Sequence, residues 1–402
     1  MECTYARTPK LEREYAEVSG KAFKRPNEFR DHKSLWMKRP HYKPEHTRIV
    51  VDEGKVVAGV AIVELPVRYG NATLKLGGIS CVATDPDMQK RGYGRACMQD
   101  TVEYMIRDGF DISFLLGIRN YYHRFGYRSA LIWAPVKLNP HALPGTLPKG
   151  LRSRKMRRSD IPQMAALYER TIGKCDLAVV RTEEDWKWYF QFGRMSNGAV
   201  LLNEGGELLA YTTANPGGRL RVNELAVADS KEAYQGVLAM LREQAKEAFA
   251  NDIEVWTVPE GGFARYCLCR EYGQWHRWTT YEGGPMLRLM NVDPLFSKIA
   301  STLSQRWQNA PRNVAAEAIT IRCPLGEVAL VPKGGSLVIR PGEQAGEVVQ
   351  MPDEALTELV MGFRPAEDIL ADANVRTTNA AKGVLGAVFP VSIPFMPPTD
   401  HM

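Results

Sequence analysis

The sequence has no long hydrophobic run of the kind that marks a membrane protein. Among its 402 residues, no stretch approaches the roughly eighteen consecutive apolar residues that a membrane-spanning helix needs. The first residues also lack a basic segment followed by an apolar run, which is the pattern of a secretory signal. These absences predict a cytoplasmic protein that acts without a membrane partner.

Cysteine and histidine are scarce and scattered, with seven of each in the chain. Only Cys267 and Cys269 lie close together, and their spacing differs from the C-x-x-C of metal and redox sites. No two histidines stand at helical spacing beside a carboxylate, as zinc or iron ligands often do. We therefore predict reduced thiols and no metal site.

A strong charge of one sign is absent as well. Lys and Arg number 52 and Asp and Glu 46, and the resulting net charge of +6 is spread along the chain rather than gathered in an arm. This balance gives no reason to expect a nucleic-acid partner. With 45% hydrophobic residues, a chain of this length exceeds what one core usually encloses, and two or three domains are expected.

Two changes in composition divide the chain. The stretch "KLNPHALPGTLPKG", residues 137–150, carries three prolines and two glycines without apolar periodicity, which predicts a linker. At "YEGGP", near residue 284, Gly-Gly-Pro interrupts a strand-like pattern. The predicted organisation is a first domain over residues 1–138, a linker over 139–150, a second domain over 151–284 and a third over 285–402.

The first domain has a readable order of elements. β-Branched runs separated by turn residues predict antiparallel strands between residues 47 and 84. After Arg91, the apolar residues Met98, Val102 and Met105 follow a helical period. A short strand over residues 112–116 then completes a strand–helix–strand unit, which predicts a mixed α/β domain.

Between the last antiparallel strand and the helix lies "QKRGYGR", residues 89–95. Its glycines let the backbone approach a ligand closely, and the helix N-terminus behind them adds roughly half a positive charge. The pattern predicts a pyrophosphate site, although a glycine-rich turn before a helix is often only a tight connection. A dinucleotide-binding fold fits less well, because its loop follows the first strand of a parallel sheet.

Further along, in "YHRFGY", Tyr122 precedes Gly126 and an aromatic residue follows that glycine. Together with the loop, this stretch resembles the acetyl-CoA-binding core of the GNAT N-acetyltransferases. The resemblance implies that the loop binds the pyrophosphate of the cofactor and that the preceding strand bulges to meet the pantetheine arm. The cofactor-binding positions are then Cys81, Val82, Ala83, Gln89, Lys90, Arg91, Gly92, Tyr93, Gly94 and Arg95.

The resemblance also assigns a catalytic role to Tyr122, which would donate a proton to the departing coenzyme A thiolate. The alternative is a core aromatic residue whose hydroxyl is satisfied within the fold. Its neighbour Tyr121 is expected to serve packing.

The order of domains resembles the enhanced-intracellular-survival (Eis-type) acetyltransferases over essentially the whole chain. This implies an α/β (α+β) protein with tandem GNAT folds, of which only the first has the acetyl-CoA loop, and a C-terminal sterol-carrier-protein-like domain. In agreement, the second domain has "DSKEAYQGVL", residues 229–238, without Gly-x-Gly where a loop would stand. The resemblance further implies a homo-hexamer.

In Eis-type enzymes the terminal carboxylate folds back into the first domain as the catalytic base, which here implies the carboxylate of Met402. Family members commonly end in an aromatic residue, so methionine is a departure. The acceptors implied are primary amines of aminoglycoside-like or polyamine-like small molecules, or lysine side chains. Glu28, Asp31 and Asp400 are candidate lining residues for such an acceptor. The Lys- and Arg-rich segment 21–40 would repel a polyamine if its side chains faced the pocket.

The predicted function is therefore an acetyl-CoA-dependent N-acetyltransferase that works by direct transfer in a ternary complex. The alternative is a non-catalytic acyl-CoA-binding sensor or ligand-sequestering protein. Turnover distinguishes the two.

Overall fold

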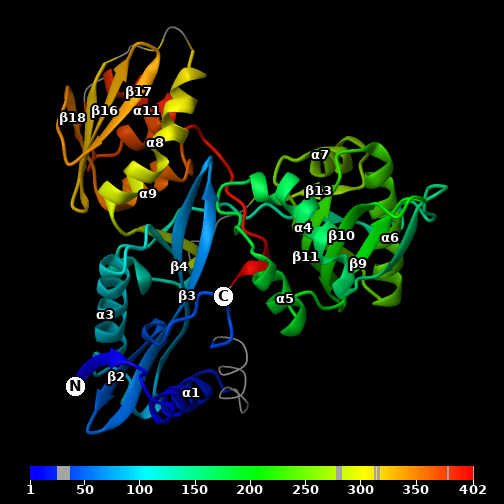
Figure 1. The fold of residues 1–402 in the computed structure, drawn as a ribbon, viewed down its shortest axis with the longest axis horizontal. Helices are drawn as coiled ribbons and strands as arrows, with labels where there is room; N and C mark the ends of the chain where they lie inside the picture. Colours follow the sequence, from blue (N-terminus) through cyan, green and yellow to red (C-terminus); the bar gives the residue numbers. More distant parts are fainter. Residues whose placement is uncertain (25–36, 278–282, 312–313, 315–316, 378–379, 402) are drawn as a thin grey trace. The chain divides into compact units, whose positions relative to one another are not determined.

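The computed structural model describes residues 1–24, 37–277, 283–311, 314, 317–377 and 380–401. The chain divides into two compact units. The first unit comprises residues 1–131 and 280–393, and the second comprises residues 132–279 and 394–401. The chain therefore passes between the units more than once, as the colours of Figure 1 allow the reader to follow.

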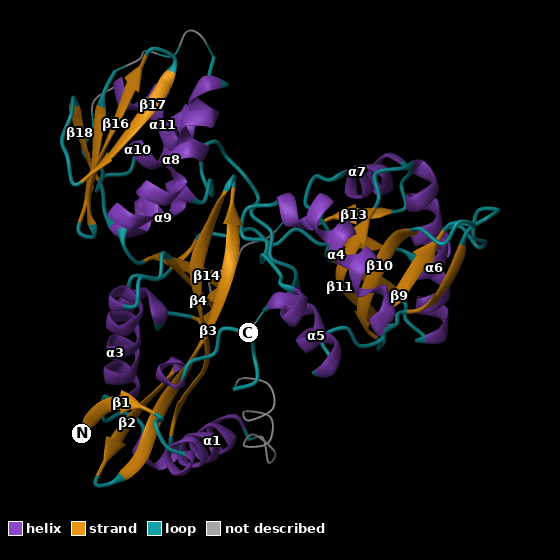
Figure 2. Ribbon diagram, viewed as in Figure 1, coloured by secondary structure: helices purple, strands orange, loops and turns teal. Residues whose placement is uncertain are grey.

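A seven-stranded sheet forms the centre of the N-terminal part of the first unit (Figure 2). Strands β2 (Thr47–Asp52), β3 (Lys55–Tyr69) and β4 (Ala72–Thr84) pair in antiparallel fashion, as predicted for residues 47–84. Strand β1 (Glu2–Tyr5) adds to β2, and β4 pairs with β5 (Ile112–Ile118) in parallel. The predicted strand–helix–strand unit is confirmed, because α3 (Tyr93–Arg107) connects β4 to β5. In spatial order the strands are β1 (Glu2–Tyr5), β2 (Thr47–Asp52), β3 (Lys55–Tyr69), β4 (Ala72–Thr84), β5 (Ile112–Ile118), β14 (Gly283–Leu289) and β6 (Arg128–Ser129).

Helices α1 (Pro9–Phe23) and α3 both pack against β3 and lie on either side of it in Figure 2. The hydroxyl of Thr8 caps α1 by accepting a hydrogen bond from the N–H of Leu11, and proline follows at the first helical position, where its fixed φ suits the helix. Helix α3 buries Met98, Val102 and Met105, the residues whose spacing predicted it. The two helices thus hold the stretch of sheet that carries the candidate site.

The second unit contains a sheet of the same size, covered by four helices: α4 (Ile161–Arg170), α5 (Glu183–Gln191), α6 (Lys231–Glu247) and α7 (Gly262–Cys269). As in the first unit, a long helix, here α6, joins two parallel neighbouring strands. In spatial order the strands are β13 (Gly273–Trp275), β7 (Val136–Leu138), β12 (Asp252–Val255), β11 (Arg219–Val227), β10 (Leu208–Asn215), β9 (Ala199–Leu202) and β8 (Arg152–Lys155).

The sheets to which strands β7 and β14 belong differ from the predicted domain limits. Strand β7 belongs to the predicted first domain but pairs with β12 and β13 of the second unit. Strand β14 pairs with β5 and β6 of the first unit, and the predicted limit between residues 284 and 285 falls inside it. The predicted linker, 139–150, includes a short 3-10 helix, Pro140–Ala142. A strand's own residues do not reveal which sheet receives it, because alternating apolar side chains suit either.

The C-terminal part of the first unit is a four-stranded sheet with helices. Its strands, in spatial order, are β17 (Ser336–Pro341), β16 (Gly326–Lys333), β15 (Ile319–Cys323) and β18 (Glu347–Gln350), and its helices are α8 (Val292–Gln308), α9 (Asp353–Val360), α10 (Ala366–Leu370) and α11 (Ala380–Val388). The β3–β4 hairpin contacts this part, since the hydroxyl of Tyr69 donates a hydrogen bond of 2.8 Å to the carbonyl of Val360. None of the helices in the described part of the chain combines the length and apolar character needed to cross a membrane.

Candidate active site

Strand β4 leaves its regular pairing with β3 at Cys81. Gly59 pairs with Ala83 and Ala61 pairs with Ser80, so two residues of β4 stand opposite one residue of β3. Cys81 has a φ of 49°, in the left-handed region that non-glycine residues rarely adopt. This is a β-bulge, and it lies at the position where the sequence predicted one.

Tyr15 of α1 holds this bulge. Its hydroxyl donates a hydrogen bond of 2.7 Å to the carbonyl of Cys81, and its side chain is fully buried. The ring packs directly on Gly59, where an added Cβ would lie 2.3 Å from Cδ2 of the tyrosine. The sequence analysis missed Tyr15, because its place on the apolar face of a helix indicates only packing.

The glycine loop ends in an open helix N-terminus. Lys90 and Gly92 have φ values of 63° and 89°, and the chain then enters α3 with Gly92 at the N-cap and no side chain capping the helix. The first N–H groups of α3 are therefore available to an anion. At Gly94 an added Cβ would lie 3.0 Å from Oγ1 of Thr84 and 3.1 Å from the hydroxyl of Tyr121, so the backbone approaches both side chains closely.

A cavity of about 790 Å³ joins the bulge, the loop and the tyrosines within the first unit. Two of the predicted cofactor-binding residues, Cys81 and Arg91, are not among those that line it. The lining residues are Ala22, Phe23, Val82, Ala83, Thr84, Gln89, Lys90, Gly92, Tyr93, Gly94, Arg95, Ile118, Tyr121, Tyr122 and Arg124. Among these described residues three are cationic and none carries a carboxylate, which suits a polyphosphate.

Tyr122 lies in a 3-10 turn, Tyr122–Phe125, and only 8% of it is exposed. Burial raises the pKa of its phenol above the usual range, so the hydroxyl is protonated at neutral pH. Tyr121, whose ring centroid lies 4.9 Å from that of Tyr122, also lines the cavity. The prediction that Tyr121 serves packing is therefore incomplete, because its hydroxyl lies beside Gly94.

Residues from other elements hold the turn that carries Tyr122. Gly126 ends it with a φ of 76°. Arg288, on the distant strand β14, donates a hydrogen bond to the carbonyl of Phe125. The hydroxyl of Tyr127 lies 2.7 Å from Oγ of Ser113 on β5. The pairing of β14 with β5 and β6 therefore brings one of the side chains that position this tyrosine turn.

The predicted acceptor and base residues are not brought to this cavity by the described part of the chain. Glu28, Asp31 and Met402 lie outside the described residues. Asp400 belongs to the second unit, where its buried carboxylate forms an ion pair with Arg181 at 2.8 Å. Within its own unit, the carboxylate of Asp400 is thus bound by another side chain, and its place in an acceptor pocket stays a prediction.

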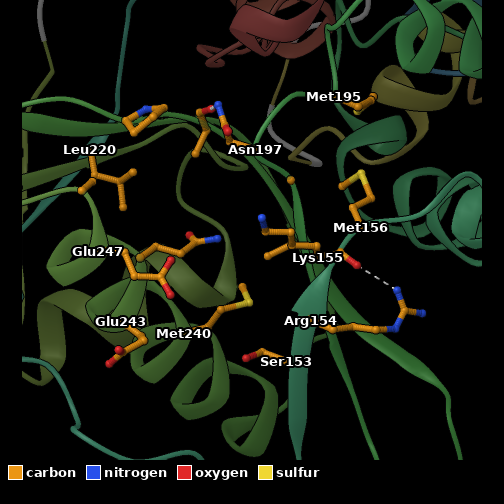
Figure 3. A pocket seen from close by; sticks show the side chains of 16 residues that line it. Ser153, Arg154, Lys155, Met156, Met195, Asn197, Leu220, Met240, Glu243 and Glu247 are labelled. Carbon is orange, nitrogen blue, oxygen red and sulfur yellow. Dashed lines mark hydrogen bonds between the residues drawn. The ribbon is translucent and has the colours of Figure 1, made fainter.

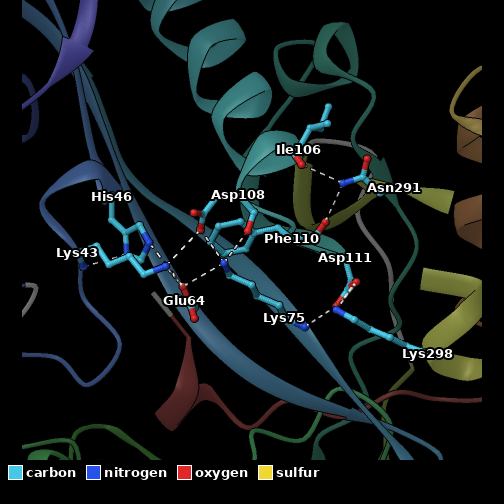
Figure 4. Close-up of polar contacts among 10 residues, drawn as sticks. All are labelled: Lys43, His46, Glu64, Lys75, Ile106, Asp108, Phe110, Asp111, Asn291 and Lys298. Carbon is cyan, nitrogen blue, oxygen red and sulfur yellow. Dashed lines mark hydrogen bonds and ion pairs between the residues drawn. The ribbon is translucent and has the colours of Figure 1, made fainter. Parts of the chain in front are cut away.

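A second polar cluster lies near the far end of α3 (Figure 4). Ligand atoms of His46, Glu64 and Asp108 lie within 4.8 Å of one another, as metal ligands would. The ammonium of Lys75, however, lies 2.6 Å from the carboxylate of Asp108 and 3.5 Å from that of Glu64. Lys43 makes further ion pairs with the same two carboxylates. Cationic side chains thus already occupy the place that a metal ion would take.

The tautomer of His46 also disfavours a metal ion in this cluster. Nδ1 accepts a hydrogen bond from the backbone N–H of Lys43 at 3.3 Å, which places the proton of a neutral ring on Nε2, the atom that faces Glu64 at 3.6 Å. Burial, aided by the charge of Lys43, lowers the pKa of His46 to about 4. The cluster is therefore best interpreted as a structural ion-pair network.

The second unit has a cavity of its own, of about 690 Å³, along β8 and the C-terminal half of α6 (Figure 3). Lys155 of β8 and Met240, Glu243 and Glu247 of α6 are among its lining residues. The other end of α6 is closed, since the hydroxyl of Ser230 accepts a hydrogen bond from the N–H of Ala233. Unlike α3, this helix does not offer an uncapped N-terminus to an anion.

Comparisons with known proteins agree with the geometry of the first unit. Residues 6–130 match a family model described as an acetyltransferase (GNAT) domain. A GNAT domain implies an acyl-coenzyme A co-substrate and an amine acceptor, and the protein is accordingly an acyltransferase. A comparison with curated proteins finds no match.

Several solved structures are similar to the whole chain. A GCN5-related N-acetyltransferase from Anabaena variabilis has 16% identity and a TM-score of 0.75, with 100% of both chains covered. One from Kribbella flavida has 19% identity and a TM-score of 0.72, covering 100% of this chain and 98% of the other. Eis1 from Mycobacterium abscessus has 14% identity and a TM-score of 0.69, with 100% of both chains covered. At these identities the likeness concerns the fold alone.

Proposed function

We propose that the protein transfers the acetyl group of acetyl-CoA to a primary amine, as an acetyltransferase of Eis type. The observation that carries the proposal is one cavity that joins an uncapped helix N-terminus, a bulged strand and a buried protonated tyrosine. The likeness in fold to Eis1 over the full length supports the Eis-type layout. The sterol-carrier-protein-like character of the third domain, the hexamer and a cytoplasmic location stay predictions.

The chain's own groups suggest how the acyl-CoA would be held. The amides at the start of α3 would bind the pyrophosphate, and Lys90 and Arg95 would add to the positive field around it. The backbone of residues 81–83, in and beside the bulge, would pair with the amides of the pantetheine arm. Cys81 and Arg91 would act through the backbone or the electrostatic field, because neither lines the cavity.

Acyl transfer then requires that the oxyanion is stabilised, that the leaving thiolate is protonated and that the acceptor nitrogen loses a proton. The acceptor nitrogen, as the neutral amine, forms a bond to the thioester carbonyl carbon, and the oxyanion that develops needs a hydrogen-bond donor. A backbone N–H near Val82 or Ala83 would serve that oxyanion. The C–S bond breaks as the intermediate collapses, and Tyr122 would give its proton to the thiolate, while the nitrogen loses a proton to a base.

For the base, the resemblance proposes the carboxylate of Met402, a residue outside the described part of the chain. A protein lengthened beyond Met402 by a few Gly and Ser residues would then lose most of its turnover but still bind acetyl-CoA. Full turnover of the lengthened protein would reject this base and shift the role to a side chain such as Glu28 or to a water molecule. The matched control carries the same added residues at the N-terminus.

The acceptor class follows from the resemblance and is open to a direct test. We propose primary amines of aminoglycoside-like or polyamine-like molecules, or lysine side chains. Incubation with acetyl-CoA and a panel of such amines, with release of free thiol as the readout, should show amine-dependent turnover. If the thiol signal stays at the hydrolysis background with every amine, the alternative of a non-catalytic acyl-CoA-binding protein is favoured.

A further inference from the structure

We infer that Tyr15 is a positioning residue for the pantetheine arm of the acyl-CoA, acting through the bulge in β4 rather than by touching the ligand. The inference rests on the proposed function, in which acyl-CoA occupies the cavity beside residues 81–95. Helix α1 would then contribute to the binding of the pantetheine arm in a way that neither the glycine loop nor the turn with Tyr122 does.

The first step is the strain at Cys81. A non-glycine residue with a positive φ is unfavourable and persists only where its surroundings hold it. The bulge also takes the carbonyl of Cys81, which is partly buried, out of the regular ladder, where it needs another hydrogen-bond partner. The hydroxyl of Tyr15 is that partner, at 2.7 Å from the carbonyl oxygen. Without it, the bulge would lose a bond that compensates its strain.

The second step is the fit between Tyr15 and Gly59. The tyrosine is fully buried, and its ring lies so close to Gly59 that an added Cβ would meet two ring carbons at 2.3 and 2.4 Å. Gly59 is itself the residue of β3 that pairs with Ala83, next to the bulge. A larger residue at position 59 would therefore displace the ring, and with it the hydroxyl that binds Cys81.

The third step is that α1 reaches the site at further points. Lys21 forms an ion pair of 3.1 Å with Asp85, the residue that follows β4. Ala22 and Phe23, at the end of the helix, line the cavity. Helix α1 thus contacts the C-terminal end of β4 at the bulge and the residue that follows the strand. A change in Tyr15 should therefore affect the bulge more than the glycine loop.

The two halves of coenzyme A place different demands on these elements. The pantetheine arm carries amides that need the displaced backbone of the bulge, whereas adenosine 3′,5′-bisphosphate lacks the arm and needs only the phosphate-binding loop and its surroundings. A residue that positions the bulge should therefore affect coenzyme A much more than the bisphosphate. General damage to the fold would weaken both ligands together.

The experiment measures the dissociation constants of coenzyme A and of adenosine 3′,5′-bisphosphate by calorimetry, with the full chain. Tyr15→Phe keeps the ring and removes the hydrogen bond. We expect the affinity for coenzyme A to fall about fivefold to tenfold, the range that one lost hydrogen bond explains, with the bisphosphate affinity unchanged within about twofold. Equal losses for both ligands, or no loss for either, would overturn the inference.

Two further variants sharpen the test. Gly59→Ala keeps the hydroxyl but displaces the ring, and it should show the same split between the two ligands. Tyr69→Phe is the matched control, since Tyr69 is also buried and also donates to a backbone carbonyl, that of Val360, and it should change neither affinity. If wild-type protein binds neither ligand, the proposed function itself fails. If wild type binds both and Tyr15→Phe shows no split, only the inference about Tyr15 fails.

Discussion

Arg181 and Asp400 form a salt bridge of 2.8 Å in which both side chains are fully buried. Arg181 also donates to both carboxylate oxygens of Glu224, at 2.8 and 2.6 Å, and Tyr189 donates to Asp400. The guanidinium lies over the ring of Tyr168, with its carbon 4.2 Å from the ring centroid. These contacts fasten segment 394–401 to the second unit by charged groups that have no access to water.

The rest of the segment is fastened too. The N–H of Phe395 donates to the carbonyl of Asp176 at 2.8 Å, and His401 stacks on Trp133 with ring centroids 6.2 Å apart. Chain ends are commonly loose, and this segment differs because its polar groups find partners inside the unit. It therefore counts as part of the core of the second unit.

Asp400→Asn should lower the free energy of unfolding of the second unit by about 3 kcal/mol, because it removes one of the two carboxylates that bind the buried guanidinium of Arg181. Glu224 still neutralises Arg181, so the loss should fall at the lower end of the range for such pairs. Urea titration measures it. Asp252→Asn is the control, since Asp252 pairs with Arg219 at the surface of the same unit, and about 1 kcal/mol or less is expected. Equal losses in the two variants would contradict the assigned role of the buried pair.

Gly94→Asp should abolish binding of coenzyme A. The new side chain would meet Thr84 and Tyr121 at about 3 Å and would bring a negative charge to the place intended for pyrophosphate. Gly92→Asp should have the same effect through its charge and through the φ of 89° that glycine tolerates. Calorimetry with coenzyme A decides it, and Gly218→Asp, at an open position of the second unit, is the control. Unchanged affinity in both loop variants would remove the assignment of the phosphate site.

Tyr122→Phe keeps the ring and removes the proton, so turnover should fall by about 10²-fold or more while the affinity for acetyl-CoA stays near that of wild type. Tyr121→Phe is the natural comparison, because both tyrosines line the cavity and burial raises the pKa of both. If Tyr121→Phe loses the turnover and Tyr122→Phe keeps it, the proton donor is Tyr121, whose hydroxyl lies beside Gly94.

The parts of the site that the sequence predicted are those that local patterns encode. The glycine loop before a helix and the helical spacing of Met98, Val102 and Met105 are properties of short stretches, and both are present in the structure. The bulge at Cys81 was predicted from a resemblance that rests on the adjacent loop. In each case the relevant residues are neighbours along the chain.

The parts that the sequence did not predict depend on pairs far apart along the chain. Nothing in the stretch around Tyr15 indicates that its hydroxyl meets Cys81, and nothing around Asp400 indicates Arg181. Strand β14 is recognisable as a strand, but the pairing that brings Arg288 to the tyrosine turn depends on which sheet receives it. Burial and long-range partners are set by the whole fold, so single-sequence patterns do not reveal them.

The last prediction concerns acid stability and His46. Burial lowers the pKa of its ring from 6.5 to about 4, so the native protein keeps the ring neutral where the unfolded chain already takes up a proton. As the pH falls from about 6.5 to 4, the unfolded state therefore binds more protons than the native state, and the free energy of unfolding decreases. Between pH 7 and 5 this group should account for a loss of about 2 kcal/mol in the first unit.

His46→Asn tests this, because asparagine can still accept the hydrogen bond from the N–H of Lys43 but cannot take up a proton. We expect the variant to be somewhat less stable than wild type at pH 7, since packing against Tyr104 and Phe110 is lost. Its free energy of unfolding, measured by urea titration at pH 7 and pH 5, should nevertheless fall less on acidification than that of wild type. Equal losses in the two proteins would show that the pKa of His46 does not differ between the native and unfolded states. The acid sensitivity of the first unit would then come from carboxylates such as Asp108. Despite partial burial, the lysine partners of Asp108, Lys75 and Lys43, lower its pKa.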